Sequence, residues 1–233
     1  MTRALTLLAA VTAVSIACSR GDQPRTALAA SPPARPAAAA ASPARDTSLL
    51  ARADGGRTAG RTDAKVWLIE ISDFQCPYCR QWHDSTYPAI RREYIDAGKV
   101  RMAYVNMPLN SHRHAWPAAE AAMCAAVQDK FWPVHDGIFA SQADWHDQAD
   151  PMPAFSAIAH RAGVDTTAWR TCVQGHQTRP LIQADADRAM RSGIESTPSF
   201  IIGNQLIAGA YPVEVFRQAL DSALAAAGRG GAR

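Results

Sequence analysis

The stretch V-W-L-I-E-I-S-D-F-Q-C-P-Y-C-R, residues 66–80, decides the fold. Its first six residues are rich in β-branched and aromatic side chains, which is typical of a buried strand. Ser72 and Asp73 fit the turn that follows. Cys76 then lies where a helix would begin, with Pro77 at the first helical position, where a missing N–H costs nothing. The stretch therefore predicts a strand, an elbow and a helix.

The elbow gives its two cysteines unequal chemistry. Cys76 lies beside unpaired backbone N–H groups and the positive end of the helix dipole, and both favour the thiolate. Cys79 lies one turn further on, close enough to close a small disulfide ring, and is more shielded. We expect thiol–disulfide exchange, in which Cys76 attacks and Cys79 releases the mixed disulfide. The alternatives are a fixed disulfide or half of a zinc site, although Cys124 and Cys172 offer no second C-x-x-C for zinc.

Composition limits the class of protein. The chain has 233 residues, is 48% hydrophobic and carries a formal charge of +3, which suits one large domain or two small ones. Lysines are few, and no basic cluster is interleaved with aromatic residues, so we do not expect nucleic-acid binding. Apart from Cys18, the cysteines form an even set, as expected of a protein exported to an oxidising compartment.

The first 18 residues are typical of an export signal peptide. Arg3 supplies a positive start, and residues 4–17 form an apolar stretch that is too short to span a bilayer. The stretch ends in Ser15-Ile-Ala-Cys18, which resembles a bacterial lipobox, although leucine is usual at the position of Ser15. Cys18 is therefore the candidate lipidation site. Cleavage after Ala17 by an ordinary signal peptidase is the alternative.

Residues 19–61 predict a disordered linker. They are rich in Ala, Pro, Gly, Arg and Ser, and they have no sustained apolar period. With a lipid on Cys18 the segment is a spacer that holds a domain away from a membrane; otherwise it is an unselected tail. We expect the folded domain to cover residues 62–228.

The first half of this domain alternates strands and a helix. Residues 65–72 and 100–107 predict strands, the second from its alternating apolar side chains. Between them, residues 77–97 predict a helix that Pro88 kinks and Gly98 ends.

The second half is a helical block followed by a hairpin. Residues 112–193 have a helical pattern and are too many for a crossover loop, so they predict an inserted all-helical subdomain. Residues 199–207 predict a β-hairpin around Gly203-Asn204, and Pro212 opens a last helix. The fold class is therefore α/β.

Three segments, which occur in the same order as in the family, resemble DsbA-like thioredoxin-fold proteins. They are F-Q-C-P-Y-C at 74–79, P-A-A-E-A-A at 117–122 with K-F-W at 130–132, and T-P-S-F at 197–200 with Gly203. The resemblance covers about residues 63–225. It implies a thioredoxin-like fold with a helical insertion, and thiol–disulfide exchange on exported proteins.

Carried over residue by residue, the resemblance makes Cys76 the nucleophile and Cys79 the resolving cysteine. Thr197 and Pro198 match the family's cis-proline pair, which binds substrate. Glu70 matches the buried acid beneath the active site.

Two of these assignments have an alternative. A buried carboxyl is costly unless it is protonated or hydrogen-bonded, so we expect Glu70 to accept the Cys79 proton through water, unless strand alternation turns Glu70 outward. A cis bend at Thr197–Pro198 would expose backbone beside Cys76, where an extended substrate can pair as an added strand. The alternative there is an ordinary turn.

The dipeptide Pro77-Tyr78 departs from the commonest dipeptide of the family, Pro-His. A neutral phenol replaces an imidazole that can help to hold a thiolate, so the redox strength does not follow from the resemblance. Phe74, Tyr78 and the strip around Pro198 are expected to form an apolar surface that contacts unfolded substrates.

Four further residues are candidates outside the elbow. Cys124 and Cys172 lie in separate predicted helices, and we expect a structural disulfide between them because an oxidising compartment would join them; two buried thiols are the alternative. His112 and His114 could bind a metal, but a polar loop near the active face is the preferred interpretation, and we expect no metal site.

The sequence therefore predicts a periplasmic thiol:disulfide oxidoreductase, anchored by lipid through Cys18, that introduces disulfides into unfolded or partly folded exported proteins. A membrane redox partner would reoxidise the Cys76–Cys79 dithiol, which serves as its own cofactor. One alternative is a reductase or isomerase, although isomerases usually carry a dimerisation module where this chain has low complexity. The other is a lipid-anchored binding or chaperone module with structural cysteines.

Overall fold

The computed structural model describes residues 48–230. The predicted signal peptide, Cys18 and linker residues 19–47 lie outside the described residues. Within the described part, no helix combines the length and the apolar character needed to cross a membrane.

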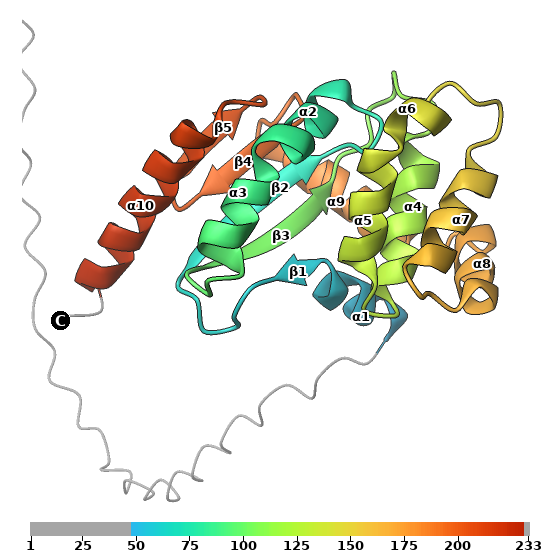
Figure 1. The fold of residues 1–233 in the computed structure, drawn as a ribbon, viewed down its shortest axis with the longest axis horizontal. Coiled ribbons are helices and arrows are strands. Elements are labelled where there is room, and N and C mark those ends of the chain that lie inside the picture. Colours follow the sequence, from blue (N-terminus) through green and yellow to red (C-terminus); the bar gives the residue numbers. More distant parts are fainter. Residues whose placement is uncertain (1–47, 231–233) are drawn as a thin grey trace, which may run out of the picture. The chain divides into compact units, whose positions relative to one another are not determined.

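A five-stranded sheet lies at the centre of the fold, in the order β1-β3-β2-β4-β5 (Figure 1). The strands are β1 (Thr58–Ala59), β2 (Val66–Ser72), β3 (Val100–Asn106), β4 (Ser199–Ile202) and β5 (Gln205–Ala208). β2 and β3 run parallel, with Glu70 beside Tyr104, and β4 is antiparallel to β2. β4 and β5 form the predicted hairpin, and Gly203 has the positive φ that suits glycine in its turn.

The helix predicted over residues 77–97 is interrupted near Pro88. α2 (Pro77–Ser85) ends, α3 (Tyr87–Ile90) begins again with Pro88 in its first turn, and a π-helix, η1 (Arg91–Ile95), completes the segment. Proline offers no N–H to the carbonyl four residues earlier, and its ring crowds that carbonyl. The chain therefore turns at this point.

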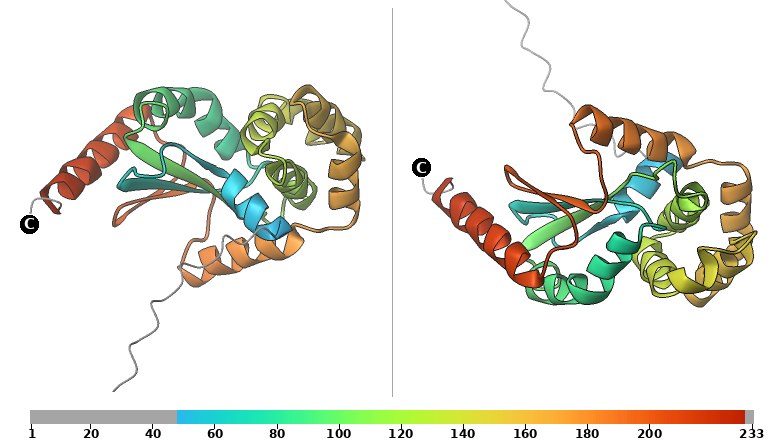
Figure 2. Two further views of the ribbon diagram at one scale, coloured as in Figure 1. Left: turned by 90° about the horizontal axis from the view of Figure 1, so that it is seen from below. Right: turned by 90° about the horizontal axis from the view of Figure 1, so that it is seen from above.

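Helices cover both faces of the sheet (Figure 2). On one face, α2, α3 and α10 (Val213–Gly230) share a core with β2 and β4; it includes Leu68, Trp82, Ile90, Phe200 and Phe216. On the opposite face lies α9 (Arg179–Arg191), and Ala189 packs there with Ile71 and Ile194. β2 is thus covered on both sides, as its apolar sequence predicts.

The structure corrects the end of the predicted helical insertion. Because α9 covers the sheet, it belongs to the thioredoxin-like part, and the insertion stops well before residue 193. Its helices are α4 (Ala115–Ala126), α5 (Phe131–Ala140), α6 (Gln142–Trp145), α7 (Met152–Arg161) and α8 (Thr166–Gln174). The alanine side chains of α4 are almost all buried, which lets neighbouring helices approach closely.

The structure also corrects the start of the folded domain, which was predicted at residue 62. α1 (Leu49–Gly56) and β1 precede that point. Arg57 forms a buried ion pair with Asp185 of α9, and a Cβ on Gly56 would lie 2.4 Å from the Ala126 carbonyl oxygen. Gly56, which was assigned to the linker, therefore packs closely against α4.

Candidate active site

The C-x-x-C motif lies where β2 gives way to α2. Cys76 is the N-cap residue of α2, in an extended conformation, and Pro77 occupies the first turn. Cys76 is 4% exposed and Cys79 is fully buried, whereas Tyr78 between them is 63% exposed. The predicted strand, elbow and helix are therefore present, and the motif is reached from the side of Tyr78.

The two cysteines are free thiols with opposite acidity. A hydrogen bond with Cys79 lowers the pKa of Cys76 to about 6, although burial alone would raise it. Backbone N–H groups at the start of α2 also lower this pKa. Burial raises the pKa of Cys79 well above its ordinary value. This asymmetry makes Cys76 the nucleophile and leaves Cys79 protonated until a base acts on it.

Glu70 lies beneath the motif with its side chain on the face that α2 covers. The residue is 1% exposed, so the alternative that alternation turns it to solvent is wrong. Neither carboxyl oxygen meets a hydrogen-bond partner among the described residues. Burial raises the pKa of Glu70 to about 7, which is the range in which a carboxyl group can exchange protons at neutral pH.

Other buried polar groups surround the Glu70 carboxyl group. The Ser72 and Tyr104 hydroxyls are buried beside it and also lack partners among the residues described. Burial, then the charges of Glu70 and Cys79, raises the pKa of Tyr104, which places these groups around one interior region. Several unpartnered polar atoms in one region are the setting in which buried water is found.

The loop before β4 closes the site on its other side. The Thr197–Pro198 peptide bond is cis, and the Cys76 thiol donates a hydrogen bond to the Thr197 carbonyl oxygen at 3.4 Å. A groove of about 380 Å³ runs beside this loop and is lined by Tyr78, Thr197 and Tyr211 among others. Thr197 connects this groove to Cys76, because its carbonyl oxygen accepts the hydrogen bond from the Cys76 thiol.

One expected contact residue lies elsewhere. Phe74, assigned by sequence to the apolar contact surface, is only 1% exposed and stacks between Tyr104 and Phe139. Tyr211, which half-exposes its ring near Tyr78, takes its place at the surface. Nothing in the local sequence indicates Tyr211, because it follows the hairpin and reaches the site only through the fold.

Sequence reasoning also missed Asp73, which was taken for a turn residue. Its side chain is fully buried, and its carboxylate accepts hydrogen bonds from the Gln75 and Leu109 N–H groups and from the His112 ring, at 2.7–2.8 Å. Asp73 thereby ties the C-x-x-C elbow to the loop after β3. His112 lies at the active face, as expected, and His114 instead pairs with the Gln148 carbonyl oxygen.

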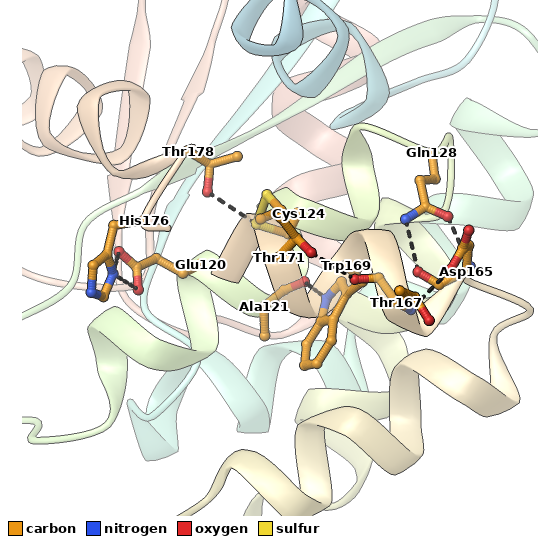
Figure 3. The surroundings of a disulfide bond; sticks show 11 residues. Glu120, Ala121, Cys124, Gln128, Asp165, Thr167, Trp169, Thr171, His176 and Thr178 are labelled. Atoms are coloured by element: carbon orange, nitrogen blue, oxygen red, sulfur yellow. Dashed lines mark hydrogen bonds and ion pairs between the residues drawn. A yellow bond between two sulfur atoms is a disulfide. The ribbon is translucent and has the colours of Figure 1, made fainter. Parts of the chain in front are cut away.

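The other cysteine pair is joined. Cys124 of α4 and Cys172 of α8 form a disulfide inside the helical insertion, with residues on either side tied by their own hydrogen bonds (Figure 3). The Trp169 indole donates to the Ala121 carbonyl oxygen at 2.9 Å. Both cysteines are buried, so this disulfide staples two helices away from the C-x-x-C motif.

One group of residues has the composition of a metal site. Among the described residues, His83, His135 and Asp136 offer ligand atoms within 4.8 Å of one another. The Arg91 guanidinium, however, lies 3.6 Å from Asp136, and both histidines are hydrogen-bonded to the same carboxylate. The carboxylate is thus already neutralised by protein groups.

Fold and site together define a thioredoxin-fold protein with two unequal, free C-x-x-C thiols. The thioredoxin family model Thioredoxin_4 matches residues 52–222. The chain therefore belongs to the thioredoxin family. The match begins inside α1, in agreement with a folded part that starts before residue 62.

Relatives carry this domain in different settings. The chain is 33% identical over 175 residues to Na(+)/H(+) antiporter NhaA 3 of Salinispora tropica, covering 75% of this chain and 26% of that protein. It thus spans about a quarter of that relative's length. It is also 28% identical over 150 residues to the probable disulfide bond formation protein D of Bacillus anthracis, covering 63% of this chain and 69% of that protein.

Solved structures share the fold at low identity. BdbD from Bacillus subtilis superposes with a TM-score of 0.67 at 21% identity, over 73% of this chain and 94% of that one. Alpha-DsbA1 from Wolbachia pipientis superposes with a TM-score of 0.66 at 23% identity, over 73% and 92% of the two chains.

Proposed function

We propose that the protein is a thiol:disulfide oxidoreductase that introduces disulfides into exported proteins. The observation that carries the proposal is the asymmetry of the motif: Cys76 has a lowered pKa at a helix N-terminus, and Cys79 is buried and protonated above Glu70. A stabilised Cys76 thiolate stabilises the reduced enzyme, which makes its disulfide an oxidant. The relatives named for disulfide bond formation support the same direction.

The exchange proceeds in two balanced steps. A substrate thiolate attacks Cys76 in the oxidised Cys76–Cys79 pair, forming a mixed disulfide and releasing Cys79, which takes a proton delivered from Glu70 through water. A second substrate thiolate then attacks the substrate sulfur of the mixed disulfide, and Cys76 leaves as a thiolate. The substrate has lost two electrons, and the enzyme holds them as a dithiol.

The groove at the cis-proline loop gives this substrate a place to bind. Thr197 and the exposed rings of Tyr78 and Tyr211 line this groove, and the Thr197 carbonyl oxygen accepts a hydrogen bond from the Cys76 thiol. An unfolded or partly folded chain can pair with such a backbone as an added strand.

The remaining parts of the proposal concern location and reoxidation. The leader and the Cys18 lipobox favour a periplasmic protein that is tethered by lipid, with residues 19–47 as the spacer. Each turnover leaves the Cys76–Cys79 pair reduced, so a membrane redox partner must reoxidise it. Mass spectrometry of the N-terminal peptide from membranes tests the lipid on Cys18: an unmodified N-terminus would remove the anchor from the proposal.

The decisive experiment is the equilibrium of the Cys76–Cys79 pair with glutathione buffers, measured on residues 48–233. We expect a potential well above that of a structural disulfide, whose values lie below about −300 mV. A strongly reducing value would overturn the oxidase direction and leave a reductase. A pair that never exchanged with glutathione would overturn catalysis and leave a binding module with structural cysteines.

A further inference from the structure

The motif itself offers Cys76 no cationic side chain. Its intervening residues are Pro77 and Tyr78, and Tyr78 is neutral and 63% exposed. A thiolate at this position would be held only by hydrogen bonds and the start of α2. Any cationic contribution to the stability of the Cys76 thiolate must therefore come from side chains on other elements.

Asp73 is the first of these charges. Its fully buried carboxylate accepts from the N–H of Gln75, the residue immediately before Cys76, at 2.7 Å, and the Cys76 N–H donates to the Asp73 carbonyl oxygen at 3.1 Å. Three donors surround this carboxylate, namely the Gln75 and Leu109 N–H groups and the His112 ring. Left alone, a buried negative charge so close to Cys76 would oppose a second negative charge on its sulfur.

His112 meets this carboxylate from the loop after β3. Its Nδ1 lies 2.8 Å from Asp73 Oδ2, and its backbone joins the start of α4, since its N–H donates to the Leu109 carbonyl oxygen and its own carbonyl oxygen accepts from Ala115. The ring is 21% exposed and can exchange protons with solvent. It is thus held firmly at the edge of the active site.

We propose that His112, held by the buried Asp73 carboxylate, is the cationic partner of the Cys76 thiolate. It supplies from outside the motif the imidazolium that Tyr78 cannot supply from within. This inference rests on the proposed function, because it assigns a residue that sets the redox strength of the same dithiol. His112 stabilises the thiolate electrostatically, and Asp73 is its positioning residue.

The electrostatics agree with this geometry. The hydrogen bond to Asp73 raises the pKa of His112 against the opposing effect of burial, and the charges of Asp73 and then Cys76 raise it further. Because electrostatic coupling between two sites is reciprocal, a Cys76 thiolate that favours protonated His112 is itself favoured by it. The imidazolium also cancels the Asp73 charge, so the elbow carries no net negative charge before the thiolate forms.

The other charged groups of this loop point elsewhere. Arg113 donates to the Asp147 carbonyl oxygen at 2.7 Å, and the buried His114 ring pairs with the Gln148 carbonyl oxygen. Outside this loop, the exposed ring of His146 at the C-terminal end of α6 lies against the Gln142 and Ala143 carbonyl oxygens and 2.8 Å from the Asp147 carboxylate. Of the ionisable side chains of this loop, His112 is the one that contacts the Asp73 carboxylate in the part of the chain described.

The consequence has a definite sign. In the dithiol form at neutral pH Cys76 carries a negative charge, whereas in the disulfide form it carries none. His112 should therefore hold its proton more tightly in the reduced protein than in the oxidised protein. By the same coupling, His112 favours the reduced form and raises the reduction potential of the pair.

A titration of the unmodified protein tests the coupling directly. The pKa of the His112 ring is measured by NMR on residues 48–233 in the dithiol and disulfide forms. We expect the reduced form to have a His112 pKa higher by roughly half a unit or more, as for an opposite charge within a few ångströms. Equal His112 pKa values in the two forms would overturn the proposal. The exposed ring of His160 on α7 is the reference signal: a change there as large as the change at His112 would mark a general effect of oxidation rather than this coupling, and would also overturn the proposal.

A variant gives the second measurement. Gln at position 112 keeps an N–H donor for Asp73 but carries no charge. H112Q should raise the Cys76 pKa, followed by thiolate absorbance at 240 nm, by about one unit. It should also shift the glutathione equilibrium about tenfold toward the disulfide, which is about 30 mV. H146Q, the matched control on the same rim, should leave both quantities unchanged.

The outcomes separate this inference from the proposed function. A folded H112Q protein with the wild-type Cys76 pKa and potential would overturn the role of His112, while the wild-type potential would still decide between oxidase and reductase. A strongly reducing wild-type protein whose Cys76 pKa still rises in H112Q would sink the oxidase proposal and keep His112 as the thiolate partner.

Discussion

The two cysteine pairs of this chain show that the surroundings of a cysteine determine its redox chemistry. Cys76 and Cys79 sit at a strand-to-helix elbow, one beside unpaired N–H groups and a neighbouring loop, the other sealed beneath it. Cys124 and Cys172 face each other across two packed helices, both buried, 48 residues apart in sequence. The first pair is built for the thiolate, and the second for the disulfide.

The difference concerns which redox form the protein favours. At the elbow, the lowered pKa of Cys76 stabilises the dithiol form. In the helical insertion the two buried sulfurs are joined in a disulfide, and the Cys124 sulfur lies 3.7 Å from the hydroxyl of Thr178, the N-cap residue of α9. Forming the disulfide should therefore lower the stability of the folded protein at Cys76–Cys79 and raise it at Cys124–Cys172.

Removing the sulfur of Cys76 or of Cys79 should have the largest effect on thiol–disulfide exchange. Cys76→Ser should abolish exchange with glutathione and with a reduced two-cysteine peptide, because a hydroxyl at neutral pH is a far weaker nucleophile than a thiolate. Cys79→Ala should instead accumulate a mixed disulfide at Cys76, seen by mass spectrometry as added mass. Exchange that survived in Cys76→Ser would show that Cys79 reacts directly and would refute the assigned roles.

Removing the other pair should cost stability and leave exchange intact. The double variant Cys124→Ala/Cys172→Ala loses a cross-link over a 48-residue separation, which the chain-entropy relation values at roughly 4 kcal/mol. Urea denaturation should show this loss, and the reduction potential of Cys76–Cys79 should equal that of the wild type. A shifted potential would mean that the insertion takes part in tuning the elbow.

The difference in stability between the dithiol form and the Cys76–Cys79 disulfide form should depend on pH. The folded pKa of Cys76 is about 6, below that of an unfolded thiol, so its thiolate contributes stability that is present at high pH and lost as pH falls through 6. Between pH 6 and about 8.5, where an unfolded thiol begins to ionise, the stability of the dithiol protein relative to the Cys76–Cys79 disulfide form should therefore rise. Above that range Cys79, whose pKa is raised in the folded protein, opposes any further gain. Thermal unfolding of both forms measures the difference, and a difference that did not change with pH would contradict the prediction.

The elbow could be predicted from sequence because its signals are local. The apolar run, Cys76 at the N-cap and Pro77 in the first turn follow one another within a few residues, and each has its own physical meaning. Glu70 was placed correctly for the same reason, as an acid between large apolar neighbours. Its burial could be established only from the fold. Because helices cover both faces of β2, strand alternation does not decide whether Glu70 meets solvent.

The features that escaped prediction depend on contacts across the chain. Gly56 was assigned to a linker because nothing in the nearby sequence indicates the Ala126 carbonyl that lies against it. In the same way, the buried partner of Arg57 is Asp185, which lies on α9 and is distant in sequence. His112 was noticed as a polar loop residue, but nothing in its neighbourhood pointed to Asp73, 39 positions earlier. Patterns along the sequence describe elements; pairings of this kind appear only when the elements meet.

A buried acid in each region allows one last and finer comparison. Glu70→Gln should slow the attack of Cys79 on a mixed disulfide about a hundredfold at pH 8, the low end of the usual contribution of a general base. The rate in the wild type should rise through a pH of about 7, where Glu70 ionises, and this inflection should be absent from the variant.

Glu120→Gln is the matched control for that measurement. Glu120 is buried in α4 but pairs with His176 at 3.0 Å rather than facing a cysteine. This change should alter stability and leave the inflection near pH 7 in place. If Glu70→Gln kept the inflection as well, the proton of Cys79 would have to leave by another route, and the buried hydroxyls of Ser72 and Tyr104 would be the groups to test next.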